Sequence, residues 1–266
     1  MAKIDVNGTT INYLDEGPAE AQALVFSPSM FFDVRMFSAQ AAAFSDRYRV
    51  VRYDHRGQGD SARSPRENLD MDTLAEDTAA LIEALNLAPC TFVGNSMGGF
   101  IALRLAARRP DLIKSAVVMG TSADIEEQAD TMDQLIEVLE EHGMEPVVEG
   151  VLQFMMGDTT LNDPSREKIL SSVKELLLSR TKEYADAAWN IAHRKGILDE
   201  LPGIKVPLLV IAGTEDHTYP PPKSEQIAKL VPGAQLEYME KTGHVHAVEN
   251  PEAVNRLLEV HLAKFK

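Results

Sequence analysis

Short runs of apolar residues alternate along the chain with longer stretches in which apolar residues recur every three or four positions. The short runs predict six strands, at residues 23–27, 49–54, 91–94, 113–119, 207–213 and 235–239. Residues 9–14 are expected in an N-terminal antiparallel pair. Because strand-like and helix-like stretches alternate, the pattern predicts an α/β fold with a mostly parallel sheet and helices on both faces.

The longer stretches at residues 71–85, 98–109 and 251–263 predict helices. The alternation breaks between residues 122 and 196, which carry no strand signal. There the pattern predicts helices near 124–142, 145–156, 165–178 and 181–193. We therefore expect a core formed by residues 1–121 and 197–266, and a helical lid at 122–196. Open α/β sheets bind ligands at the carboxyl edge of the strands, and the lid is expected to cover that edge.

Composition narrows the classes of function. Hydrophobic residues make up 44% of the chain, enough for a large core, and the formal net charge is −15. This charge disfavours nucleic acid as a partner and opposes strongly anionic substrates. The single cysteine, Cys90, excludes an intrachain disulfide. No signal peptide or membrane-spanning stretch is recognisable, so we expect a cytoplasmic protein without a membrane partner. The oligomeric state stays open.

The strongest chemical signal is the segment Val93-Gly94-Asn95-Ser96-Met97-Gly98-Gly99, which matches the pattern G-x-S-x-G. It follows a predicted strand and precedes a predicted helix. Side chains at Gly94 and Gly98 would collide across such a sharp turn, which explains the glycines. Ser96 would then stand at a helix N-terminus, where amide groups favour a developing oxyanion. We interpret Ser96 as the nucleophile of a serine hydrolase.

A histidine base is expected near the C-terminus, because this type of site has the chain order Ser, then Asp or Glu, then His. His244 follows the predicted strand at 235–239, and Gly243 gives it a flexible loop backbone. His246 is the rival candidate. We favour His244, since the start of the next helix at Pro251 lies at the expected distance. The remaining histidines show no metal-ligand spacing, so no metal site is predicted.

The acid is expected after the preceding strand, and Asp216 is the choice there. Its carboxylate would bond the far nitrogen of His244, fix the tautomer and stabilise the imidazolium. Glu215 precedes Asp216 by one residue, and its side chain should point away from His244. Asp124 is the alternative if the acid instead follows an earlier strand.

These motifs resemble those of the α/β-hydrolase superfamily over nearly the whole chain. The most similar group is that of the 3-oxoadipate enol-lactonases. That group has a small polar loop of the type Ser-Asn-Ser-Leu where this chain has Ser27-Pro28-Ser29-Met30. It also has a counterpart of residues 51–61, which we expect to brace this loop, and the pattern Gly-His-x4-Glu-x-Pro fits residues 243–251. The resemblance implies an eight-stranded sheet with a lid.

Carried over by position, the resemblance implies oxyanion donors at the backbone amides of Met30 and Met97. It also draws attention to Phe31, which replaces the usual glycine of the loop. The group has a lid tryptophan close to the position of Met132, whereas the only tryptophan of this chain is Trp189. We expect Phe31, Met132, Trp189 and Val245 to line the substrate pocket, and the apolar residues of the lid to favour uncharged acyl groups.

The leading hypothesis is hydrolysis of a small carboxylic ester or lactone through an acyl-enzyme on Ser96, without a cofactor. Carbon–carbon hydrolysis of ring-cleavage diketones is an alternative, but enzymes of that kind usually have Trp where this chain has Val245. Cofactor-free haloperoxidases or perhydrolases often have Pro where this chain has Phe31. A further alternative is a non-enzymatic sensor of a small ligand, since regulatory relatives also have a proline at the position of Pro28.

Overall fold

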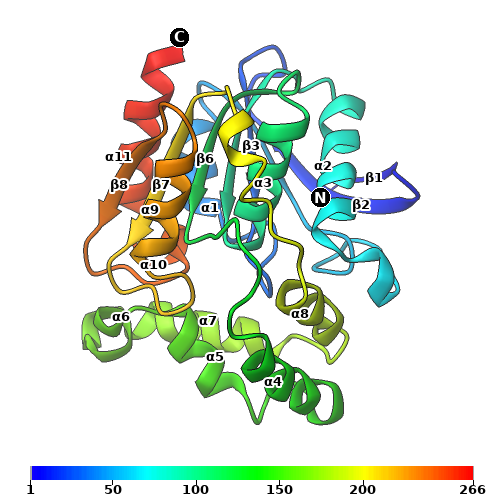
Figure 1. The fold of residues 1–266 in the computed structure, drawn as a ribbon, viewed down its shortest axis with the longest axis vertical. Helices are drawn as coiled ribbons and strands as arrows, with labels where there is room; N and C mark the ends of the chain where they lie inside the picture. The colour runs from blue at the N-terminus through cyan, green and yellow to red at the C-terminus, as the bar shows by residue number, and fades with distance from the viewer. Residues whose placement is uncertain (1, 266) are drawn as a thin grey trace.

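The computed structural model describes residues 2–265, and its centre is a single eight-stranded sheet (Figure 1). The spatial order is β1-β2-β4-β3-β5-β6-β7-β8. β2 pairs antiparallel with β1 and β4, and the other neighbours are parallel. The strands are β1 (Ala2–Val6), β2 (Thr9–Glu16), β3 (Ala23–Ser27), β4 (Arg49–Tyr53), β5 (Cys90–Asn95), β6 (Ile113–Met119), β7 (Leu208–Gly213) and β8 (Gln235–Met239). The predicted mostly parallel α/β fold is confirmed.

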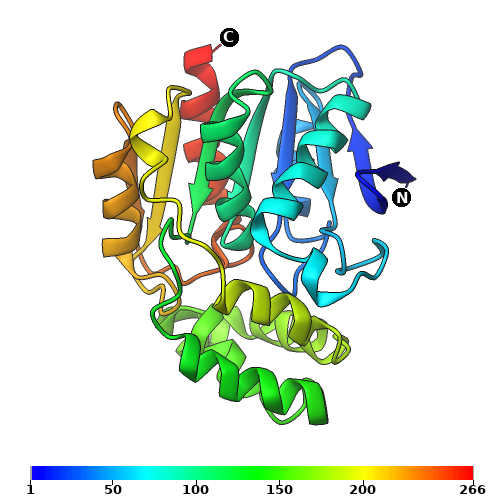
Figure 2. The ribbon, with the colours of Figure 1, turned by 45° about the vertical axis from the view of Figure 1, so that its right-hand side comes forward.

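Helices cover both faces of the sheet, as Figure 2 shows. α1 (Ser38–Phe44) and α11 (Pro251–Leu262) pack together on one face. α2 (Met71–Ala84), α3 (Met97–Arg108) and α9 (Pro221–Leu230) lie on the other. Every residue of β3, β5 and β7 is buried, which explains why these strands appear in the sequence as continuous apolar runs.

Five helices follow β6 and gather at one end of the sheet (Figures 1 and 2). They are α4 (Ala129–His142), α5 (Val148–Met155), α6 (Asp158–Asn162), α7 (Glu167–Leu178) and α8 (Tyr184–Ala192). We keep the term lid for residues 122–196. α4 begins later than predicted, because residues 124–128 form an irregular connection with a bend and a turn. The five-residue α6 was not predicted, since it is too short to show helical periodicity.

The lid faces the carboxyl ends of the parallel strands. Hydrogen bonds join it to the loops that follow β3, β7 and β8. These loops and the β5–α3 turn meet at one edge, since β3 pairs with β5 and β7 pairs with β8. No helix within residues 2–265 is long and apolar enough to cross a membrane.

Candidate active site

Ser96 lies at the turn between β5 and α3. Its backbone has φ +55° and ψ −113°, a conformation that residues other than glycine rarely adopt. A β-carbon at Gly94 would meet the backbone of Gly98, and one at Gly98 would meet the carbonyl of Ser27. The glycines of the motif are therefore required by the close approach of β3, β5 and α3. Such strain persists only where the surrounding structure imposes it, and it is common at reactive residues.

His244 and Asp216 lie side by side under the lid. The Nδ1 atom of His244 is 3.2 and 3.1 Å from the two carboxylate oxygens of Asp216. The backbone amides of Thr218 and Tyr219 also donate to Asp216, at 2.9 and 2.8 Å. An ionised carboxylate only accepts hydrogen bonds, so this contact places a proton on Nδ1 and leaves Nε2 of neutral His244 free to accept one.

The rival residues have other partners. His246 is fully buried, its Nδ1 lies 3.0 Å from the carbonyl oxygen of His244, and burial lowers its pKa to about 4. The carboxylate of Glu215 accepts hydrogen bonds from the amide and hydroxyl of Thr159 in the lid, at 2.6 and 2.7 Å. Asp124 accepts a bond from the neighbouring Ile125 amide. Among the described residues, Asp216 is the carboxylate that the structure brings to His244.

In residues 29–32 of the loop after β3, one backbone amide is free. The Ser29 amide donates to Met36, the Phe31 amide to Gln58, and the Phe32 amide to the carbonyl of Ser29. Among the described contacts of this loop, the amide of Met30 has no acceptor. Met97 is the first residue of α3, where backbone amides lack intrahelical partners. Both amides predicted as oxyanion donors are therefore available.

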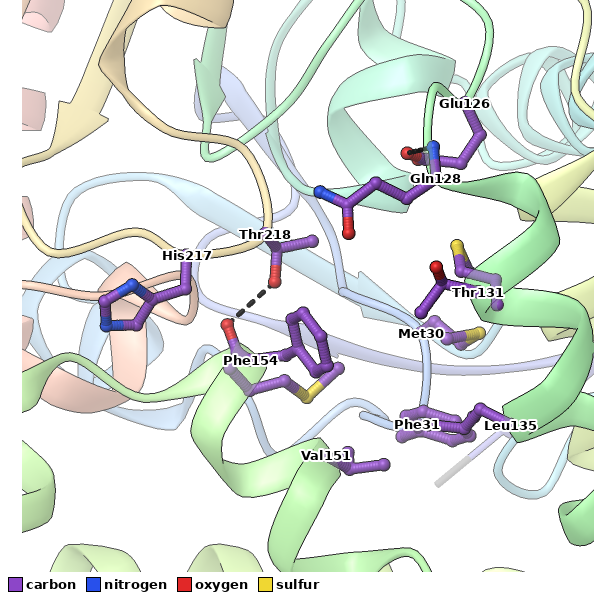
Figure 3. Close-up of a pocket in the computed structure, with 12 residues that line it drawn as sticks. Met30, Phe31, Glu126, Gln128, Thr131, Leu135, Val151, Phe154, His217 and Thr218 are labelled. Atoms are coloured by element: carbon purple, nitrogen blue, oxygen red, sulfur yellow. Dashed lines mark hydrogen bonds between the residues drawn. The ribbon is translucent and has the colours of Figure 1, made fainter.

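A pocket of about 170 Å³ lies beside these loops (Figure 3). Its wall includes Phe31 and Met132, two of the four residues that the sequence predicts for a substrate pocket. Trp189 and Val245 are not among the described residues that line it. Trp189 instead stacks on His193 at 4.2 Å between ring centroids, and Val245 is fully buried. The other lining residues are Met30, Glu126, Gln128, Thr131, Leu135, Val151, Phe154, Met155, His217 and Thr218.

A model of the α/β hydrolase fold matches residues 23–251. The chain belongs to the α/β hydrolase family.

Its relatives include enzymes that act on lactones. The chain is 30% identical to 3-oxoadipate enol-lactonase 1 of Acinetobacter baylyi, over 92% of this chain and 90% of that protein. The crystal structure of the enol-lactonase from Burkholderia xenovorans LB400 superimposes with a TM-score of 0.91 at 29% identity, over 98% of this chain and all of that one. A putative non-heme bromoperoxidase, BpoC of Mycobacterium tuberculosis, is 29% identical over 82% of this chain and 84% of that protein. The predicted resemblance is confirmed.

This α/β hydrolase has a buried network that the sequence did not reveal. Glu126 accepts hydrogen bonds from Arg194 and from the hydroxyl of Tyr219, at 2.8 and 2.9 Å. Burial raises the pKa of Glu126, but the bonds from these partners outweigh it and hold the pKa below its usual range. The ring of Tyr219 contacts that of His244 edge-on, with centroids 5.5 Å apart. The network thus joins both ends of the lid to the imidazole.

The middle of the lid is hydrogen-bonded to the loop after β8 that carries His244, which we call the histidine loop. The amide of His244 donates to the carbonyl of Met155 at the end of α5, at 3.0 Å. The buried carboxylate of Glu249 accepts bonds from the Gly157 amide and the Thr160 hydroxyl, at 2.8 and 2.7 Å. Within residues 2–265, no group of three or more His, Cys, Asp or Glu side chains is arranged to hold a metal ion.

Proposed function

We propose that this α/β hydrolase cleaves uncharged carboxylic esters or lactones through an acyl-enzyme on Ser96. The observation that carries the proposal is the strained Ser96 at the strand–helix turn, together with the hydrogen-bonded pair of His244 and Asp216. In this scheme Nε2 of His244 takes the proton from the hydroxyl as Ser96 attacks the carbonyl carbon. The tetrahedral oxyanion is stabilised by the amides of Met30 and Met97.

His244 then returns the proton to the leaving oxygen as the bond to that oxygen breaks. A water molecule that gives its proton to His244 then attacks the acyl carbonyl carbon. The bond to the Ser96 oxygen breaks, the carboxylic acid leaves, and His244 returns the proton to Ser96. Asp216 keeps the tautomer and stabilises the imidazolium throughout. The scheme requires no cofactor.

The side chains that line the pocket favour an uncharged substrate. Methionine, leucine, valine and phenylalanine side chains supply most of it, and among the described lining residues there is no lysine or arginine. The one carboxylate, Glu126, already accepts hydrogen bonds from Arg194, Tyr219 and the Gln128 amide. A carboxylate on the substrate would lose its hydration here without meeting a lysine or arginine, and the one lining histidine, His217, is already paired with Asp158. We therefore expect neutral lactones to be better substrates than the lactone of a dicarboxylic acid such as 3-oxoadipate, which keeps one carboxylate free.

The test compares wild type with Ser96→Ala on p-nitrophenyl butyrate, a neutral γ-lactone and an anionic lactone. Wild type should turn over the first two and act at least tenfold less efficiently on the third, and Ser96→Ala should be inactive on all. Circular dichroism should show that Ser96→Ala is folded. Equal turnover by folded Ser96→Ala would overturn the serine mechanism, and a preference for the anionic lactone would overturn the substrate assignment.

A second candidate is attack of hydrogen peroxide on the same acyl-enzyme, which would release a peracid. The similarity to BpoC, named as a putative non-heme bromoperoxidase, favours it. The reaction is recognised by Ser96-dependent bromination of monochlorodimedone in acetate, hydrogen peroxide and bromide, in which the released peracid oxidises bromide to the brominating species and is itself reduced to acetate. A rate of bromination below 1% of the rate of ester hydrolysis would exclude it as the main activity.

A further inference from the structure

Phe31, beside the proposed oxyanion donor Met30, has an unusual backbone. Its φ is +70°, in the left-handed region that bulky side chains rarely adopt. The side chain is nevertheless buried, 1% exposed, with its ring 5.9 Å from that of Tyr184. Backbone strain of this kind must be held by surrounding contacts.

Two side chains hold the peptide groups of Phe31 from opposite sides. The amide donates to Oε1 of Gln58 at 3.1 Å. The carbonyl accepts a bond from Nε of Arg180 in the lid at 2.7 Å, and Arg180 also binds Asp33 at 2.6 Å. Burial raises the pKa of Asp33, but hydrogen bonds from Arg35 and Arg180 hold it at about 2. The loop is therefore fixed through its backbone.

Gln58 also reaches the second proposed donor. Its Nε2 atom donates to the sulfur of Met97 at 3.5 Å, a distance suited to a weak sulfur acceptor. The side chains of Gln58 and Met97 are both buried. One buried amide thus touches the loop after β3 and the first residue of α3, from which the two proposed donors come.

The backbone of Gln58 is fixed as well. Its amide donates to the carbonyl of His55 at 2.9 Å, and its carbonyl accepts from the Ser61 amide at 3.1 Å. The same turn is tied to α2 by the buried ion pair between Arg56 and Asp77. The backbone that carries the Gln58 side chain is thus fixed by contacts outside the site.

From these contacts we infer that Gln58 is a positioning residue for the oxyanion hole. By engaging the amide of Phe31, it holds the loop so that the amide of Met30 points to the reacting carbonyl oxygen, and through Met97 it fixes the distance to the second donor. The inference rests on the proposed function, since it assigns a role in the same reaction. Gln58 acts through these two amides and does not touch the substrate.

The decisive variant is Gln58→Met, which keeps an unbranched side chain of similar size but removes the amide. Loss of one oxyanion donor typically costs 10²–10³ in kcat, and a displaced donor should cost less. We expect kcat on p-nitrophenyl butyrate to fall by about 10- to 100-fold, with KM changed by less than about threefold. The dissociation constant of butaneboronic acid, whose serine adduct is tetrahedral, should rise by a factor similar to the loss in kcat/KM.

Two further variants separate positioning from a general effect on stability. Gln58→Glu keeps an oxygen acceptor for the Phe31 amide, and it should recover most of kcat. Gln40→Leu is the matched control, because Gln40 is also fully buried and its amide binds Pro251 and Asn255 of α11, at 3.3 and 3.0 Å. Gln40→Leu should lower the Tm and leave kcat and boronate binding within about twofold of wild type.

The outcomes distinguish the inference from the proposed function. If folded Gln58→Met loses stability as Gln40→Leu does, but keeps kcat and boronate affinity within threefold of wild type, the inference is overturned and the ester hydrolase assignment stands. If wild type shows no Ser96-dependent turnover, the proposed function fails and the inference fails with it. Equal losses of kcat in Gln58→Met and Gln58→Glu would also contradict a role through the Phe31 amide.

Discussion

The two histidines of the C-terminal loop differ in what surrounds them. His244 faces Asp216, whereas His246 is buried, has no hydrogen bond to a carboxylate among residues 2–265, and places its Nδ1 against the carbonyl of His244. Burial lowers the pKa of His246 to about 4, so this ring is neutral at the pH of ordinary assays. A ring that contacts the backbone of the candidate base supports the loop and does not exchange protons with a substrate.

We predict that His244→Ala lowers kcat on p-nitrophenyl butyrate as much as Ser96→Ala, by roughly 10⁴-fold or more, because residues of a triad act as a unit. His246→Ala should lower the Tm but keep kcat of the folded protein within about tenfold of wild type. The measurements are steady-state kinetics and thermal unfolding of each variant. The opposite ranking of the two variants in kcat would show that His246 is the base.

What the sequence reveals about single residues depends on whether the signal is local. Ser96 and its glycines are recognisable because the turn forces small residues at fixed spacing. His244 and Asp216 are recognisable from chain order after two strands. Gln58 is 27 residues from Phe31, and Arg180 is 149 residues from it. Neither contact leaves a local pattern, so only the folded structure reveals them.

Among the helices, α4 and α8 contain the two lid residues that the sequence singled out for the pocket. Met132 on α4 lines it, while Trp189 on α8 stacks on His193 and lies 5.4 Å beneath the guanidinium of Arg66. A substitution of Met132 is therefore expected to change the shape of the pocket, and a substitution of Trp189 is not. The two substitutions form a matched pair on neighbouring helices.

We predict that Met132→Ala shifts the preferred acyl length of p-nitrophenyl esters to longer chains. The shortened side chain makes room for extra methylenes, each worth roughly 0.8 kcal/mol when buried, or up to about fourfold in kcat/KM. Trp189→Ala should lower the Tm and leave the ranking of acyl lengths unchanged. The measurement is kcat/KM across acetate to octanoate. If only Trp189→Ala shifts the preferred acyl length, the residues that set acyl-length specificity lie on α8 and not on α4.

Strands were easier to predict than short helices. β3, β6 and β8 have the predicted bounds, because buried strands produce apolar runs that end at turns. α1, α6 and α10 (His246–Glu249) were not predicted, since helices of four to seven residues offer too few turns for a periodic pattern. The ten-residue α9 was not predicted either, because its buried residues are only Ser224 and Ile227, which give no apolar pattern. The connection at residues 124–128 was wrongly expected to be helical. There Glu126 turns inward to Arg194 and Tyr219, and these long-range contacts override the local preference.

For the molecule as a whole, three buried histidines link stability to pH. Burial lowers the pKa of His55, His246 and His261 to about 4. In the unfolded chain each would take up a proton near its ordinary pKa of about 6.5. Between these two values the unfolded state binds more protons than the folded state, so the free energy of unfolding falls as the pH is lowered. The stability gained by keeping these three histidines neutral is therefore fully present above pH 6.5 and is lost as the pH falls from 6.5 to 4.

We predict that urea unfolding of wild type shows a lower free energy at pH 5 than at pH 7. His261→Leu should reduce this difference by roughly 1–2 kcal/mol, because it removes one of the three linked protons. Neither ring nitrogen of His261 has a hydrogen-bond partner among the described residues, so the variant breaks no such bond. An unchanged difference between the two pH values in His261→Leu would refute the linkage at this residue.

The attachment of the lid to the histidine loop limits how the protein can be engineered. A chimera that takes residues 122–196 from a relative would also replace the Met155 carbonyl that holds the His244 amide. A β-carbon at Gly157 would meet Glu215 and the Gly243 backbone, so a donor with a larger residue there would displace the loop that carries the base. Successful lid grafts into this scaffold must therefore keep residues 155–160 as host sequence and exchange the remaining helices around them.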